Sequence, residues 1–145
     1  MNNLLNITEN ISNKFQSFSL LVLRLILAYG FYEPAINKWN DITSVASWFE
    51  SMGIPAPTLN AYMAATTETL GVVLLTLGLF TRLISFPLMI IMVVAITTVH
   101  LSNGFSAADN GFEIPLYFMF MLFVLFSHGA GKFSLDNLFF KNRRL

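Results

Sequence analysis

The 145-residue chain has no cysteine and few charged residues, since only 11% of its positions are Asp, Glu, Lys or Arg. The absence of cysteine excludes disulfides, thiolate metal sites and thiol redox chemistry, so any redox function requires a bound cofactor, quinone or metal. A formal net charge of zero gives no reason to expect a nucleic-acid partner. Because an average soluble domain carries about 25% charged residues, the shortage indicates that lipid replaces water around much of the chain.

Motifs of self-contained enzymes are also missing. The sequence contains no dinucleotide-binding fingerprint, no phosphate-binding loop, no haem-attachment motif and no nucleophile elbow. We therefore do not expect an autonomous enzyme. A cleavable signal peptide is not expected either, because the first 19 residues are polar and no small-residue cleavage site follows the first apolar run.

Hydrophobic residues, by contrast, make up 55% of the chain and gather in long runs. A helix needs about 20 predominantly apolar residues to cross a bilayer. The sequence therefore predicts an all-α membrane domain at 18–129, a bundle of four transmembrane helices, between a polar segment at 1–17 and a basic amphipathic tail at 130–145. A short helix at 41–52, with Trp48 and Phe49, is expected to lie at the lipid–water interface. The four predicted spans are 18–38, 58–80, 83–101 and 112–129.

Lysine and arginine favour one orientation of these spans. They occur in the N-terminal segment, in the turn at Arg82 and in the tail, whereas the other two connections contain only Lys38. Positive loops remain in the cytoplasm, so both termini are predicted to be cytoplasmic in the inner membrane of a bacterium.

Ionisable residues within the spans must face the bundle interior, because a charge in lipid costs about 3 kcal/mol. At 1.5 Å per residue, Arg24 and Glu68 differ in depth by only about 6 Å. We therefore predict an ion pair between Arg24 and Glu68 that joins the first two spans. A structural clamp is the simplest interpretation of this pair.

A second polar group is expected at the outer end of the bundle, where Glu33, His100 and Glu113 approach from three helices. Tyr29 shares a helix face with Glu33. Asp109 lies in the loop just before Glu113. Carboxylates beside an imidazole can share a proton, bind a divalent or copper ion, or hydrogen-bond a quinone oxygen. Alternatively, the acids are interfacial residues that cap helices, and His100 only completes a helix end.

Several short motifs of the chain resemble those of the DoxX family of small four-helix membrane proteins. The resemblance covers about residues 18–136, and no single motif carries it alone. The matching elements are Arg24, Met52-Gly53-Ile54-Pro55-Ala56-Pro57, Glu68 with Leu70-Gly71, Leu77-Gly78-Leu79-Phe80-Thr81-Arg82, Thr98-Val99-His100, Asn103-Gly104-Phe105, Asn110-Gly111-Phe112-Glu113 and Phe133-Ser134-Leu135-Asp136.

The resemblance implies a redox function, because family members are linked to a terminal quinol oxidase, to thiosulfate–quinone electron transfer and to complexes that counter oxidative stress. Tyr32-Glu33-Pro34 with Lys38-Trp39, and Glu113-Ile114-Pro115, look closest to members associated with the maturation of copper-binding peptides. Fold and family alone do not fix a reaction.

Three functions remain open. The first is a quinone-linked redox accessory subunit, with Arg24, Glu68, His100 and Glu113 holding the head group. The second is metal handling or small-solute transport by His100, Glu113, Glu33 and Asp109, for which four helices would require a homo-oligomer. The third is an anchor or assembly subunit for a redox or metal-handling protein partner.

Overall fold

The computed structural model describes residues 2–140. Within these residues the regular structure is entirely helical, which confirms the predicted all-α class. The tail cations Lys141, Arg143 and Arg144, on which part of the predicted orientation rests, lie outside the described residues.

Six α-helices follow one another within residues 2–140. After α4 the chain continues as a π-helix, Ile96–His100, and then as a 3₁₀ turn, Leu101–Asn103. A second 3₁₀ turn, Ala107–Asp109, precedes α5. The α-helices are α1 Asn2–Asn40, α2 Ile42–Ser51, α3 Pro57–Leu77, α4 Thr81–Ala95, α5 Glu113–His128 and α6 Leu135–Phe140.

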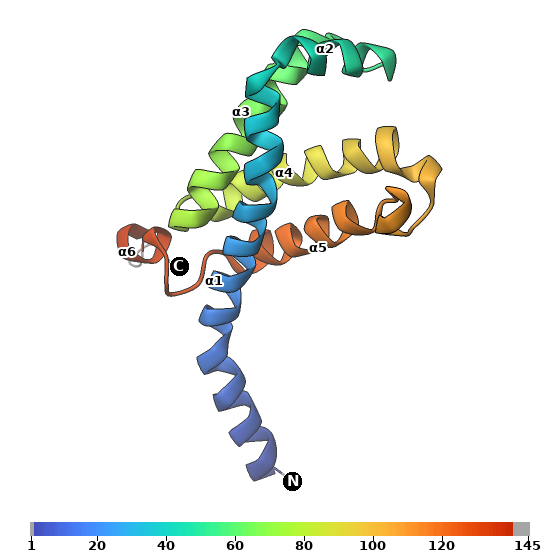
Figure 1. Cartoon of the computed structure of the whole chain (residues 1–145). Helices are drawn as coiled ribbons and strands as arrows, with labels where there is room; N and C mark the ends of the chain where they lie inside the picture. The colour runs from blue at the N-terminus through green and yellow to red at the C-terminus, as the bar shows by residue number, and fades with distance from the viewer. Residues whose placement is uncertain (1, 141–145) are drawn as a thin grey trace.

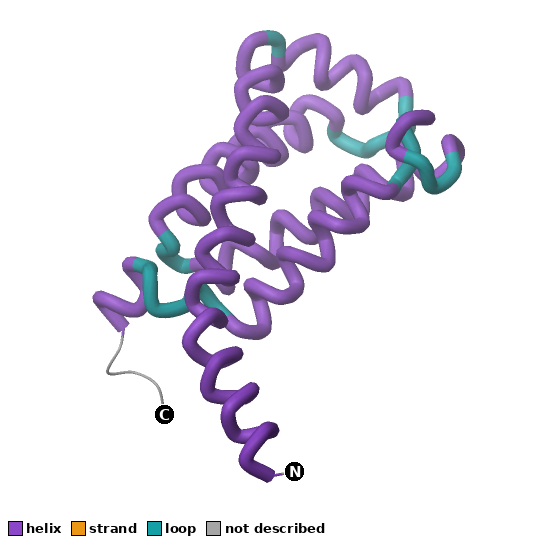
Figure 2. Tube along the Cα trace, turned by 60° about the horizontal axis from the view of Figure 1, so that its bottom comes forward, coloured by secondary structure: helices purple, strands orange, loops and turns teal. Residues whose placement is uncertain are grey.

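The long helices associate mainly as two pairs. Helix α1 packs along α3, and α4 packs along α5, while α3 and α4 join the two pairs (Figure 1). The short helix α2 packs on α3, at the end of the molecule opposite the N-terminus. The first turns of α1 project beyond the other helices, as both views show (Figures 1 and 2).

Leucines fill the centre of the bundle. Leu27, Leu75, Leu88, Leu122 and Leu125 come from all four long helices and are completely buried. Small residues allow the helices to approach. At Gly71, a Cβ atom would lie 2.9 Å from the side chain of Leu88, closer than real Cβ contacts.

Large apolar side chains also cover the outside of the bundle. Leu83 is 72% exposed and Phe120 is 58% exposed, which fits a protein whose outer surface meets lipid. By length and composition, the segments Ile7–Asn40 and Thr81–Asn103 are able to cross a membrane, and α5 is a shorter apolar helix. That all four long helices cross the membrane remains a prediction.

Two predicted segments can be compared with the helices. The polar segment predicted at 1–17 forms, from Asn2 on, the first turns of α1, which is continuous to Asn40. Of the predicted amphipathic tail, the described part contains only the short α6. The predicted helix at 41–52 is confirmed as α2, which begins after Asp41, whose carboxylate accepts the backbone N–H of Ser44.

Candidate functional site

A cavity of about 820 Å³ lies between α1, α2, α3, α4 and the start of α5. Most of its wall is apolar, contributed by side chains such as Phe31, Phe49, Met63, Ile91, Val99 and Phe118. Small-molecule sites in proteins are mostly apolar cavities of this size with a few polar groups that fix orientation. The polar groups in this wall are therefore the candidates for ligand recognition.

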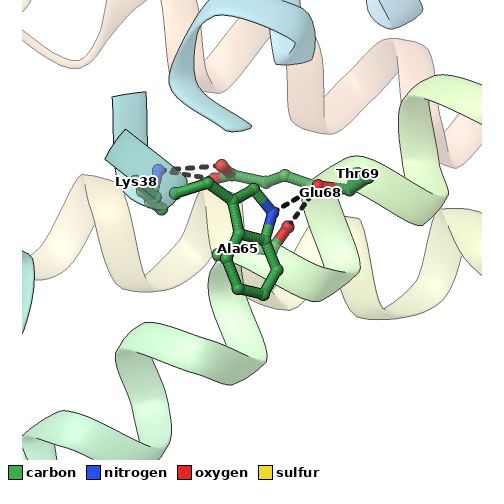
Figure 3. Close-up of polar contacts among 5 residues, drawn as sticks. Lys38, Ala65, Glu68 and Thr69 are labelled. Atoms are coloured by element: carbon green, nitrogen blue, oxygen red, sulfur yellow. Dashed lines mark hydrogen bonds and ion pairs between the residues drawn. The ribbon is translucent and has the colours of Figure 1, made fainter. Parts of the chain in front are cut away.

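Lys38 and Glu68 provide the only ion pair in the part of the chain that the structure describes. The Nζ atom of Lys38 donates to both carboxylate oxygens of Glu68, at 2.8 and 3.0 Å (Figure 3). The side chain of Glu68 is 4% exposed and that of Lys38 is 18% exposed. Because both side chains line the cavity, a charged donor and a charged acceptor face an otherwise apolar space.

The packing of α1 against α3 brings these two residues together. Lys38 lies in the last turn of α1, and Glu68 lies in the middle of α3. Beside the ion pair, Trp39 donates its indole N–H to the hydroxyl of Thr69, which in turn donates to the carbonyl of Ala65 (Figure 3). Two adjacent polar contacts therefore fix the register of α1 on α3.

His100 is the third ionisable side chain in the cavity wall. Its Nδ1 atom lies 2.8 Å from the carbonyl oxygen of Asn110, which also accepts the side-chain amide of Asn103. The polar part of the lining is completed by Asn60, Thr67 and Thr98. The side-chain amide of Asn60 donates to the carbonyl of Pro55.

The predicted pair between Arg24 and Glu68 is wrong, because Glu68 pairs with Lys38 instead. Arg24 is completely buried and donates to the carbonyl oxygens of Leu75 and Phe133. The last carbonyls of a helix lack intrahelical donors, so a cation at the end of α3 satisfies one of them and opposes the negative end of the helix dipole. Arg24 therefore acts at the opposite end of α3 from the cavity.

The segment around α6 completes this second polar centre. The carboxylate of Asp136 accepts the backbone N–H groups of Phe80 and Thr81, at 2.7 and 3.0 Å, and so caps the start of α4. It also attracts the charge of Arg24. The sequence analysis placed Asp136 only in a family motif, because a cap supplied from 55 residues away leaves no local signal.

The predicted outer cluster is only partly assembled. The carboxylate of Glu113 accepts the backbone N–H of Ala107 and the hydroxyl of Tyr117. Tyr29, Glu33 and Asp109 are exposed and do not line the cavity. Among the described residues, no three His, Asp or Glu side chains lie close enough to hold a metal ion. Of the predicted site residues, the structure therefore places Glu68 and His100 in the cavity wall and leaves the others outside it.

The sequence did not reveal the role of Lys38, which was interpreted as a loop charge and as part of a family motif. The helical spacing of α1 contains a usable signal, however. The buried positions of α1 include Arg24, Leu27, Phe31 and Ala35, and the same spacing continues to Lys38. A lysine on the inward face of an apolar helix requires a partner, and Glu68 supplies it.

The chain is similar to one known protein family and to several known proteins. Residues 19–101 match the sequence profile of the DoxX family. An uncharacterized protein of Haemophilus influenzae is 36% identical over 129 residues, covering 83% of this chain and 82% of the relative. A Bacillus subtilis protein provisionally named the oxidoreductase CatD is 27% identical, covering 91% of this chain and 95% of the relative. An uncharacterized membrane protein of Mycobacterium tuberculosis is 30% identical, covering 81% of this chain and 79% of the relative. No solved structure matches the chain.

Proposed function

Because the chain belongs to the DoxX family of membrane proteins, we propose that it is a quinone-linked redox accessory subunit that binds a quinone head group beside Lys38 and Glu68. The observation that carries this proposal is the ion pair itself. Its two charges, joined at 2.8 Å, line a largely apolar cavity of about 820 Å³. Ionisable groups inside a membrane protein are costly and mark functional sites more often than inert structure.

The chemistry of the wall suits a quinone. The ring is flat and apolar, which favours contact with Phe49, Met63 and Phe118, and its carbonyl oxygens need hydrogen-bond donors. The ammonium group of Lys38 carries three N–H donors, so it can keep Glu68 and still donate to a ligand oxygen. The carboxylate of Glu68 is the nearest proton carrier for an oxygen bound there.

Two further observations support a redox accessory function. The chain has no cysteine, so electrons must be carried by a bound molecule and not by thiols. A relative of nearly the same length is named as an oxidoreductase. In this proposal the protein lies in the bacterial inner membrane with both termini in the cytoplasm, and a protein partner exchanges electrons with the bound quinone.

Tryptophan fluorescence provides the test, since quinones quench indole emission. Trp48 lines the cavity and Trp39 does not. The two side chains are 48% and 47% exposed, so dissolved quinone reaches both to a similar extent and each indole serves as the control for the other. Trp39→Phe leaves Trp48 as the reporter, and Trp48→Phe leaves Trp39. Both variants, purified in lipid nanodiscs, are titrated with duroquinone.

We expect saturable quenching of Trp48, a weak and linear effect on Trp39, and loss of the saturable part when Lys38→Met is added. Linear quenching of both indoles, unchanged by Lys38→Met, would overturn the proposal, because it would show only the collisional effect of quinone dissolved in lipid.

A further inference from the structure

The hydrogen bond of His100 fixes which of its ring nitrogens can meet a ligand. Its Nδ1 atom lies 2.8 Å from the carbonyl oxygen of Asn110. A carbonyl oxygen only accepts hydrogen bonds, so Nδ1 must carry the proton and donate it. In neutral His100 the other nitrogen, Nε2, is therefore an acceptor. Within the described part of the chain, Nε2 has no hydrogen-bond partner, although the side chain lines the cavity.

His100 belongs to a π-helix. In Ile96–His100 the backbone widens, and the N–H of Leu101 bonds to the carbonyl of Ile96 five residues earlier. Such a bulge adds one residue to the turn and leaves a carbonyl without its usual donor. The hydroxyls of Thr97 and Thr98 donate to the carbonyls of Val93 and Val94, just before the bulge.

His100 is the last residue of this π-helix and lines the cavity together with Thr98 and Val99. Its Nδ1 atom remains bonded to the loop before α5.

From this geometry we infer that His100 makes the cavity selective for the reduced, hydroxyl-bearing form of a quinone. The inference rests on the proposed function and adds the redox state of the ligand. Lys38 donates equally well to a carbonyl or a hydroxyl oxygen. The oxygens of Glu68, each holding one hydrogen bond from Lys38, can still accept from a hydroxyl. Nε2 of His100, which has no hydrogen-bond partner among the described residues, adds a further acceptor that a hydroxyl can use and a carbonyl cannot. A hydroquinone has that hydroxyl and a quinone does not.

Two substitutions separate the ligand-facing nitrogen from the structural one. His100→Asn keeps a polar group near the position of Nδ1, where it can still donate to Asn110, and removes the group at Nε2. His100→Gln retains an amide oxygen near the position of Nε2. His128→Asn is the matched control, because His128 bonds within its own end of α5 and does not line the cavity.

The experiment is calorimetric titration of each protein in nanodiscs with durohydroquinone and with duroquinone, without oxygen, at pH 8, where an ordinary imidazole is neutral. We expect His100→Asn to weaken hydroquinone binding about fivefold to tenfold, the effect of one hydrogen bond, without changing quinone binding. His100→Gln is expected to retain most of the preference, and His128→Asn all of it. Unchanged quinone affinity shows in the same titration that the cavity has folded.

Other outcomes overturn the inference. If His100→Asn weakens both ligands equally, or neither, His100 does not distinguish the redox state, although the proposed function stands. If His100→Asn does not fold, two other results decide the question. The inference is overturned if His100→Gln loses the preference for hydroquinone, or if the wild-type protein shows no such preference. If the wild-type protein binds neither ligand, the proposed function itself fails.

Discussion

The Nζ atom of Lys38 lies 2.8 Å from Oε2 of Glu68, and this contact joins α1 to α3 across the wall of an apolar cavity. Neither charge has another ionic partner among the described residues. The attraction between two buried charges barely offsets the loss of their hydration, so the pair adds little net stability. Each residue nevertheless depends on the other, because removal of one partner leaves a charge or a polar group unpaired at a position of low exposure.

A double-mutant cycle tests this dependence. Lys38→Met and Glu68→Gln are each expected to lower the free energy of unfolding by about 3 kcal/mol, because each leaves a buried polar partner behind. The double variant should lose much less than the sum. Unfolding by SDS in mixed micelles measures these changes, with Glu33→Gln, at an exposed position of α1, as the control. Additive losses would show that the two side chains are not coupled.

Asp136 holds the start of α4 from a distance, and its removal should loosen that end of the helix. We expect Asp136→Ala to reduce stability by about 1 kcal/mol, as for loss of a helix cap, because the N–H groups of Phe80 and Thr81 lose their acceptor. Hydrogen exchange should accelerate at these two amides. Asp109→Ala, in an exposed loop, is the control. Unchanged exchange at Phe80 and Thr81 would contradict the capping function.

Gly78 is expected to tolerate no side chain, because Arg24 occupies the space beside it. Both Gly78 and Gly53 have positive φ, +65° and +74°, so alanine at either position costs about 1–2 kcal/mol of backbone strain. At Gly53 a Cβ atom would meet nothing within 4 Å, whereas at Gly78 it would lie 1.8 Å from Nη1 of Arg24. Gly78→Ala should therefore prevent folding, and Gly53→Ala should only lower stability. Equal effects, measured by folded yield and thermal unfolding, would refute the clash.

The start of α2 should respond to acid. The hydroxyl and then the backbone N–H of Ser44 donate to Asp41, and these hydrogen bonds hold the pKa of Asp41 below its usual value of 3.8. A lowered pKa means that the stabilisation is present above pH 3.8 and is lost as pH falls through the lowered value. Trp48 fluorescence in the Trp39→Phe protein reports on α2. Asp41→Asn keeps the cap and should remove this acid transition, whereas its persistence would assign the transition to another group.

The fold could be predicted largely from the sequence because lipid imposes a simple pattern. Long apolar runs located the four long helices, and the short helix expected at 41–52 is α2. The failures were at the edges. Counting apolar residues places the start of the first helix near residue 18, whereas the polar first turns extend α1 back to Asn2. Helix α6 follows a connection whose contacts are with residues far away in the sequence, so no local pattern predicted it.

The site was less predictable, because the depth of a residue does not determine its partner. Arg24 and Glu68 lie at similar estimated depths, yet Arg24 bonds to the end of α3 and to the carbonyl of Phe133. Glu68 instead meets Lys38, whose position on the buried face of α1 was visible only in the helical spacing. His100 was identified, but the π-helix that contains it has no signal in an apolar segment.

Photoaffinity labelling with an azidoquinone tests most directly whether the cavity beside Lys38 and Glu68 binds a quinone. The protein in nanodiscs is irradiated with the reagent, and the labelled residues are identified by mass spectrometry. We predict labels on cavity residues such as Phe49, Met63 and Ile91, removed by excess duroquinone and reduced by Lys38→Met. Labels confined to exposed side chains such as Phe120 and Phe123, and unaffected by duroquinone, would contradict the account.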